Sequence, residues 1–155
     1  MNDSINVFGN LNIVLKDKTN NVKQEVNVPN LVVASGKAYI AKRMANPASS
    51  NSNVMSQMAV GSGTGTPVTS DVTLGTETGR VALTSNTSAP SGFLANTIQY
   101  QATFSAGVAT GSVSEAGIFT QGASDNGTML CRTSFTPLNK LASDSISITW
   151  NITVA

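Results

Sequence analysis

Histidine is absent from this sequence of 155 residues, and cysteine occurs once, as Cys131. Without histidine, the chain lacks the commonest general base and the usual nitrogen ligand of zinc and iron sites. One cysteine excludes an intrachain disulfide and a cysteine-based metal cluster, so we interpret Cys131 as a small apolar residue of a strand. We therefore expect no metal, no cofactor, no small-molecule substrate and no enzymatic activity.

Charge and aromatic side chains are also scarce. Charged residues make up 11% of the chain, its net charge is +1, and aromatic residues make up 5%. The sequence therefore lacks the basic patch and the stacking platform that are typical of nucleic-acid-binding proteins. Because a weak net charge gives little protection against association, we expect the chain to bind another protein surface and to form a homo-oligomer.

Long apolar runs and a basic leader are missing too. The first eight residues, Met-Asn-Asp-Ser-Ile-Asn-Val-Phe, contain no lysine or arginine and no apolar stretch. This start predicts neither a signal peptide nor a membrane span.

The eight carboxylates are scattered, and several suit local backbone roles. Asp17 and Asp125 lie in expected hairpin turns, Asp71 precedes an expected helical turn, and Asp144 precedes the last expected strand. This distribution argues against the paired acids of a glycosidase.

Two structural ion pairs are expected from the positions of opposite charges. Glu77 and Arg80 can pair at the start of a strand, and Glu115 can meet Arg132 across a hairpin. Partner recognition by these groups is the alternative interpretation.

What the chain has in abundance is small polar residues in alternating patterns. Ser, Thr and Asn together account for 53 residues, and period-2 alternation of apolar and polar residues predicts half-buried strands. The clearest are Thr97–Phe104 and Ile146–Val154, whose inward residues include Tyr100 and Trp150. Alternation at residues 11–15 and 22–28 predicts a hairpin that ends at Pro29, and Asp125-Asn126-Gly127 signals another.

One helix is expected at about residues 36–46. Ser35 is a suitable N-cap and Asn46-Pro47 ends the helix. Lys37, Lys42 and Arg43 point outward, either into solvent or toward an acidic partner. The following residues 46–53 form a polar loop.

The central stretch, residues 58–83, predicts a strand, an ordered crossover loop at about 61–78, and a second strand. Gly61, Gly63 and Gly65 suit backbone positions that a side chain would forbid. Their spacing differs from that of a phosphate-binding P-loop or a dinucleotide fingerprint. We interpret this segment as a structural loop and not as an active site.

These patterns together predict an all-β chain. The expected architecture is an antiparallel β-sandwich of about eight strands with one short helix near residues 36–46. Residues 1–155 form a single domain, with the N-terminal hairpin at 5–28 as a contact arm.

Several groups of residues carry a resemblance to a known family. They are Ala59-Val60-Gly61-Ser62-Gly63-Thr64, Pro67, Asp71, Leu74-Gly75-Thr76-Glu77, Arg80-Val81-Ala82-Leu83, Glu115-Ala116-Gly117-Ile118-Phe119, Met129-Leu130-Cys131-Arg132-Thr133 and Ile148-Thr149-Trp150-Asn151-Ile152-Thr153-Val154. They resemble a module that recurs in tailed-bacteriophage structural proteins, over about residues 31–155. Similar modules occur in small head proteins and in tail-fibre or baseplate components.

The resemblance implies a virion protein that is made in the host cytoplasm. The chain ends at the module's last strand, without the shaft or tip of a fibre, which favours a capsid decoration (cement) protein on the outer head surface. Its partner would be the major capsid protein, and it would stabilise contacts between capsid subunits. The alternative is a tail, fibre-attachment or baseplate adaptor protein.

We expect the partner contacts in the hairpin at 10–28, the loop at 46–53, the crossover at 61–78 and the cations of the helix. The candidate contact residues are Ile13, Leu15, Ser49, Asn51, Gly63, Thr64, Thr66, Pro67, Lys42 and Arg43.

Overall fold

The structure is a computed structural model that describes residues 5–45, 54–88, 96–120 and 127–155. Over these residues the chain forms nine strands and one helix. The elements are β1 (Val7–Lys16), β2 (Val22–Val32), α1 (Ala34–Ala45), β3 (Gln57–Gly61), β4 (Glu77–Ala82), β5 (Ser85–Ser88), β6 (Thr97–Phe104), β7 (Gly111–Phe119), β8 (Met129–Lys140) and β9 (Ser145–Val154). The all-β class with one short helix is confirmed.

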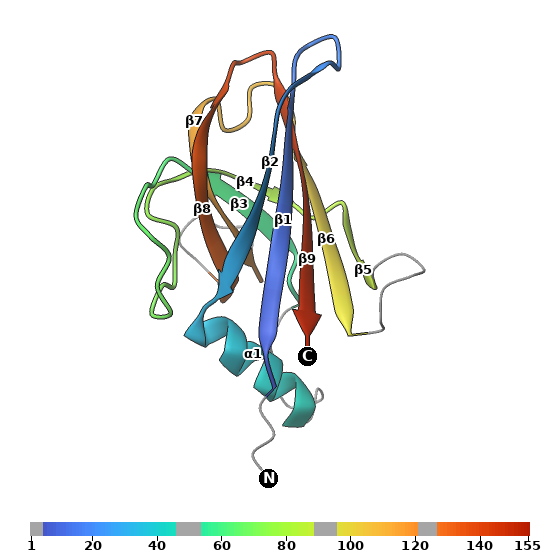
Figure 1. Cartoon of the computed structure of the whole chain (residues 1–155), viewed down its shortest axis with the longest axis vertical. Helices are drawn as coiled ribbons and strands as arrows, with labels where there is room; N and C mark the ends of the chain where they lie inside the picture. The colour runs from blue at the N-terminus through green and yellow to red at the C-terminus, as the bar shows by residue number, and fades with distance from the viewer. Residues whose placement is uncertain (1–4, 46–53, 89–95, 121–126) are drawn as a thin grey trace.

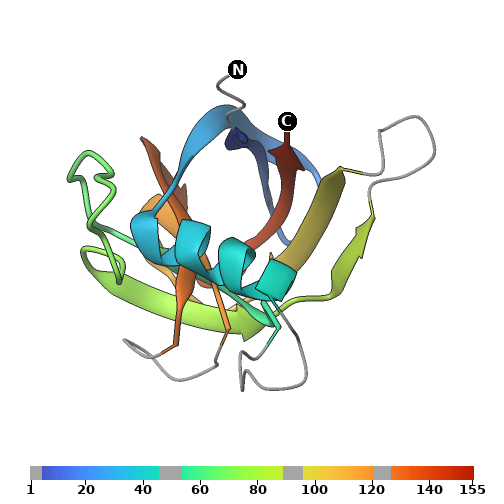
Figure 2. The same ribbon diagram turned by 90° about the horizontal axis from the view of Figure 1, so that it is seen from below.

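The strands form one antiparallel sheet in the order β4-β3-β7-β8-β2-β1-β9-β6-β5. The sheet curls into a half-barrel (Figures 1 and 2) and replaces the expected two-layer sandwich. The cause lies in β2, which pairs with β1 as far as Asn30 and then with β8 through Leu31 and Val32. Backbone pairing therefore continues from one half of the sheet into the other.

The chain passes directly from one edge strand of the sheet, β4, to the other edge strand, β5. β4 pairs with β3 and β5 pairs with β6, yet only Leu83 and Thr84 separate β4 from β5. The Leu83 N–H donates to the Ser56 carbonyl at 2.9 Å, and the Thr84 N–H donates to the Gln101 carbonyl at 2.8 Å. One continuous segment thus supplies both edges of the curled sheet.

The N-terminal hairpin is confirmed and is longer than predicted. Its turn is organised by Asp17, whose Oδ1 accepts the Thr19 hydroxyl at 2.7 Å and the Asn21 N–H at 2.9 Å. These bonds, the Thr19 hydroxyl first, lower the pKa of Asp17 to about 2. The expected end at Pro29 is wrong, because β2 continues to Val32 and the Pro29 carbonyl accepts the Thr133 hydroxyl at 2.7 Å.

The core lies inside the curve of the sheet and follows the predicted alternation. Trp150 is fully buried between its strand neighbours Leu11 and Tyr100. Phe104 is also fully buried, and Tyr100 is half-buried against the same cluster. The inward face of β9 is therefore the one predicted from its period-2 pattern.

Helix α1 covers one end of the half-barrel (Figure 2). The Lys37 N–H donates to the Val33 carbonyl at 3.0 Å, so Val33, and not Ser35, is the N-cap residue. The Ser35 hydroxyl donates instead to the Met129 carbonyl at 2.9 Å, which ties the helix to β8. A β-carbon at Gly36 would collide with the backbone of Leu130, and this close approach explains the glycine.

Candidate functional site: the 62–76 loop

Residues 62–76 connect β3 to β4 and project from the side of the sheet, drawn in green in Figure 1. We call them the 62–76 loop. Because β3 and β4 are hydrogen-bonded neighbours, the loop returns beside the strand it left, and the expected crossover is wrong. The Ser62 N–H closes its base by donating to the Thr76 carbonyl at 2.9 Å.

The loop is folded around the buried carboxylate of Glu115, which comes from β7. Glu115 Oε1 accepts the N–H groups of Gly63 at 2.9 Å and Thr76 at 2.8 Å, and Oε2 accepts the Gly75 N–H at 2.9 Å. The Glu115 side chain is fully buried. Both ends of the loop are thus bound to one internal anion.

Arg132 of β8 completes this cluster from the other side. Its guanidinium contacts Glu115 Oε2 at 2.8 Å and donates through Nη1 to Asp71 Oδ2 at 2.7 Å. A further bond runs from Nη2 to the Gly65 carbonyl at 3.3 Å. Arg132 therefore connects the strands of the sheet to the outer turn of the loop, and the expected Glu115–Arg132 pair is confirmed.

The cluster holds both partners in their charged forms. Burial by itself would raise the pKa of Glu115, but the bonds from Thr76, Gly75, Arg132 and Gly63 outweigh it and the pKa is lowered. Burial would likewise lower the pKa of Arg132, yet its contacts with Asp71 and Glu115 raise it. These charges are used for structure, because each already has an internal partner.

The glycine-rich stretch now has a physical explanation. Backbone N–H groups that converge on an anion resemble a phosphate-binding nest, but here the Glu115 carboxylate occupies that position. A β-carbon at Gly63 would collide with this carboxylate, and one at Gly61 would collide with the Thr76 carbonyl. The lack of a side chain at Gly61 and Gly63 therefore leaves room for the Glu115 carboxylate and for the backbone that binds it.

The outer surface of the loop is exposed and mainly uncharged. Val68 is 50% exposed and Val72 is 61% exposed. Thr64 and Thr66 are also exposed, while Pro67 is half-buried. Apolar side chains held outward on a fixed backbone are suited to binding another surface by shape and apolar burial.

The second predicted ion pair lies beside this loop. Arg80 Nη2 contacts Glu77 Oε2 at 2.6 Å, and both side chains are buried. The Arg80 guanidinium also lies 3.9 Å above the centre of the Phe119 ring. The structural interpretation of Glu77 and Arg80 is confirmed.

The structure brings only part of the predicted contact set together. Gly63, Thr64, Thr66 and Pro67 share the 62–76 loop. Ile13 is 0% exposed and Leu15 is 2% exposed, so their choice as contact residues is corrected: both point into the core. Ser49 and Asn51 lie outside the described residues.

The two helix cations of the set lie apart from the loop, on α1. Lys42 is exposed. Arg43 is half-buried and donates to the Tyr39 hydroxyl at 2.9 Å.

The outward face of the hairpin carries polar contacts between its strands. Asn12 Nδ2 donates to Glu25 Oε1 at 2.6 Å and to Asn27 Oδ1 at 3.0 Å. On the neighbouring strands, Gln99 Nε2 donates to Asn151 Oδ1 at 3.1 Å. The amide side chains on this face hydrogen-bond to one another across neighbouring strands.

Sequence reasoning missed Val68 and Val72 as surface residues and Asp71 as a partner of Arg132. The two valines flank a turn rich in hydroxyl residues, and that context was the only signal for their exposure. The expected helical turn after Asp71 is wrong: Asp71 Oδ2 accepts the Val68 N–H at 2.9 Å and so closes a turn before it.

A buried charged corner lies at the far end of the sheet. Lys140 is fully buried and donates from Nζ to the Ser105 carbonyl at 3.0 Å. Asp144 accepts Lys23 Nζ at 2.6 Å and the Leu141 N–H at 3.0 Å. Burial lowers the pKa of Lys140, whereas the bond from Lys23 lowers that of Asp144. Lys23 and Asp144 are thus bound to one another and Asp144 to the β8–β9 turn, while Lys140 is bound to the segment between β6 and β7.

Within the described ranges, no cluster of three or more histidine, cysteine or carboxylate side chains is arranged to hold a metal ion. Over the same ranges, no helix has the length and apolar character needed to cross a membrane. Cys131 is buried, and burial raises the pKa of its thiol well above the usual value.

No protein-family model matches the chain, and neither the curated proteins nor the solved structures contain a match.

Proposed function

We propose that this chain is a structural protein of a tailed-bacteriophage virion, a decoration protein that binds the outer surface of the icosahedral head. The major capsid protein is its partner, and it binds across neighbouring capsid subunits, as a homo-oligomer or at repeated positions of the lattice. The proposal rests on the resemblance in residues 31–155 and on the form of the 62–76 loop.

The observation that carries the proposal is the exposed, uncharged rim of that loop on its buried anchor. Val68 and Val72 are at least half exposed, while the backbone beneath them is bound to Glu115 and Arg132. A contact surface that is already ordered loses little conformational entropy on binding. The loop is therefore suited to a static contact of shape and apolar burial.

The mechanism is one of mass action. A protein that binds the assembled shell, but not its separate subunits, stabilises the shell by an amount set by its concentration and affinity. Each contact of a small domain buries roughly 800 Å² per partner. Linking such contacts through a lattice or an oligomer raises avidity by a factor of about 100 to 10,000.

The test is to remove the protein from particles and add it back. We expect it to rebind in hundreds of copies per particle, to remain bound from low to high salt, and to raise the temperature at which the particle opens. A few copies per particle with unchanged heat resistance would reject the decoration role and favour the tail or baseplate adaptor.

A pair of variants tests the loop itself. The double change Val68→Ser and Val72→Ser is expected to weaken rebinding by about tenfold or more, since burying one valine contributes about 1.5 kcal/mol. Leu141→Ser is the matched control, because Leu141 is 51% exposed and lies in the β8–β9 turn, outside every candidate patch. Equal rebinding of both variants would reject the loop as the contact surface.

A further inference from the structure

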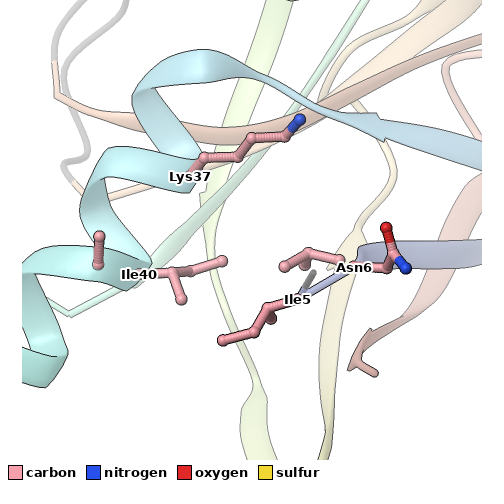
Figure 3. Close-up of a pocket in the computed structure, with 6 residues that line it drawn as sticks. Ile5, Asn6, Lys37 and Ile40 are labelled. Carbon is pink, nitrogen blue, oxygen red and sulfur yellow. The ribbon is translucent and has the colours of Figure 1, made fainter. Parts of the chain in front are cut away.

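A groove lies between α1 and the first residues of the chain that the structure describes. It has a volume of about 270 Å³ and is lined by Ile5, Asn6, Val7, Lys37, Ile40 and Ala41. Figure 3 shows Ile40 of the helix and Ile5 facing one another across it, while the Lys37 side chain extends along the rim. The Asn6 amide points away from the helix, so the walls are mainly apolar.

One wall of the groove is a free strand edge. β1 pairs with β9 from Val7 onward, but its pairing with β2 begins only at Gly9, because β2 leaves toward β8. Asn6 exchanges both backbone bonds with Ala155 on the β9 side, at 2.6 and 2.8 Å. Since backbone groups alternate sides along a strand, the N–H and carbonyl of Val7 face the groove, and no described strand pairs with them.

Apolar side chains flank this edge on both faces of the sheet. Ile5, on the groove side, is 65% exposed, and Phe8, on the opposite side, is 54% exposed. An additional strand along the edge would place its alternate side chains over these two residues. In β-strand addition, an exposed sheet edge supplies backbone bonds and a neighbouring hollow accepts alternate side chains, and both features are present here.

The charges around the groove indicate the chemistry of that strand. In the described part of the chain, each of the six side-chain carboxylates is bound by an internal donor: Asp17, Glu25, Asp71, Glu77, Glu115 and Asp144. Lys37 and Lys42 of α1 are exposed, and neither forms an ion pair with any of those six. Lys37 beside the groove thus has no partner among the described carboxylates and can bind a carboxylate of another protein.

We propose that this groove binds an extended segment of a partner protein whose groove-facing side carries both apolar residues and a carboxylate. The segment adds to the edge of β1 at Val7, inserts apolar side chains between Ile5 and Ile40, and places a carboxylate against Lys37. A volume of about 270 Å³ falls below the roughly 300–1,000 Å³ of common small-molecule sites, and it suits the side chains of a peptide. This inference goes beyond the decoration role and holds for any partner that carries such a segment.

The test uses the purified chain and synthetic octapeptides labelled with fluorescein. The probe carries valine and aspartate in turn at the alternate positions that face the groove, and serine at the positions between them. In one comparison peptide lysine replaces the aspartates, and in the other serine replaces the valines. Fluorescence anisotropy is expected to show binding of the valine–aspartate peptide and at least about tenfold weaker binding of the other two. Amide shifts in a ¹H–¹⁵N spectrum should concentrate at Ile5, Val7, Phe8, Lys37 and Ile40.

Two charge reversals locate the contact. Lys37→Glu is expected to weaken binding by about fivefold, and the loss should shrink at high salt. Lys18→Glu is the matched control: it makes the same charge change at an exposed position in the β1–β2 turn, and it should leave binding unchanged.

Three results would overturn the inference: equal binding of the three peptides, equal loss from both charge reversals, or amide shifts away from the groove. Dimerisation of the chain through this edge, measured by analytical ultracentrifugation, would also overturn it by assigning the groove to a second copy. Because these measurements use no virion, their failure leaves the particle-rebinding test of the decoration role intact.

Discussion

The 62–76 loop and the groove beside α1 are both exposed candidate contact surfaces, but they use charge in opposite ways. Under the loop, Glu115, Arg132 and Asp71 are bound to one another, and the surface above them is uncharged. Beside the groove, Lys37 has no carboxylate partner among the described residues. Charge fixes the shape of the first surface and is available for recognition at the second.

The few charged residues of this chain thus lie in two kinds of environment, one buried and paired and the other exposed. A buried ion cluster requires every partner to be present, since an unpaired buried charge is strongly destabilising. An exposed lysine contributes little to stability whether or not it is paired. The two surfaces should therefore respond differently to mutation, pH and salt.

The largest effect is expected from removing the anion under the loop. Glu115→Ala should lower the free energy of unfolding by about 3–5 kcal/mol, because it leaves Arg132 buried without its main partner and frees the N–H groups of Gly63, Gly75 and Thr76. Urea denaturation measures the loss, and amide exchange of those three residues should accelerate.

The matched control for that change is Glu25→Ala. Glu25 is exposed and accepts only the Asn12 amide among the described contacts, so its removal should cost no more than about 0.5 kcal/mol. Similar losses for the two variants would show that the cluster does not organise the loop.

A smaller effect is expected from filling the space next to the carboxylate. A β-carbon at Gly63 would collide with the Glu115 carboxylate, whereas at Gly65 the nearest atom is Arg132 Nη2 at 4.0 Å. Gly63→Ala should therefore lower the free energy of unfolding by about 1–3 kcal/mol, and Gly65→Ala by no more than about 0.5 kcal/mol. Thermal unfolding of the two variants measures this difference. An equal loss of stability would contradict the close packing of Gly63 against the Glu115 carboxylate.

Acid should weaken the loop region, because the buried Glu115 carboxylate organises it in its ionised form. The pKa of Glu115 lies below its ordinary value of 4.5 in the folded protein, so its ionisation stabilises the fold fully above pH 4.5. That contribution is lost as pH falls from 4.5 through the folded pKa. Urea denaturation between pH 7 and 3 should show this loss in the wild type, and Glu115→Gln should show a flatter dependence.

The smallest effect is expected at the groove itself. Lys37→Ala should change the free energy of unfolding by no more than about 0.5 kcal/mol, because Lys37 is exposed and forms no ion pair with a described carboxylate. Arg132→Ala is the contrasting variant, with an expected loss of about 3–5 kcal/mol. Comparable losses for the two cations would remove the distinction between the surfaces.

Much of the local structure was predictable because it depends on neighbours in sequence. The strand at Ile146–Val154 alternates without interruption, and Trp150 is buried where that pattern places it. The Glu115–Arg132 pair was also predictable, since both residues lie on strands joined by a hairpin with an Asn-Gly turn signal. Asp125 and Asn126 of that signal lie outside the described residues, but β7 and β8 pair as expected.

The errors occur where partners far apart in sequence decide the outcome. Ser35 has the chemistry of an N-cap, yet the Met129 carbonyl takes its hydroxyl and the helix begins earlier. Ile13 and Leu15 were assigned to a contact arm, but β9 pairs with β1 and their side of the hairpin becomes part of the core. The Met129 carbonyl and strand β9 both lie far in sequence from the residues they bind, so a short stretch of sequence does not reveal these contacts.

By itself, the sequence determined the all-β class, the N-terminal hairpin and the inward faces of β6 and β9, because two-residue periodicity and turn chemistry act over a few bonds. Tertiary structure alone decided that the sheet curls into a half-barrel, since this depends on β2 changing partner and on Leu83 and Thr84 joining two edges. It also decided that Gly63, Gly75 and Thr76 converge on Glu115. The energy of such a buried carboxylate depends on all its donors at once, and only the folded chain brings them together.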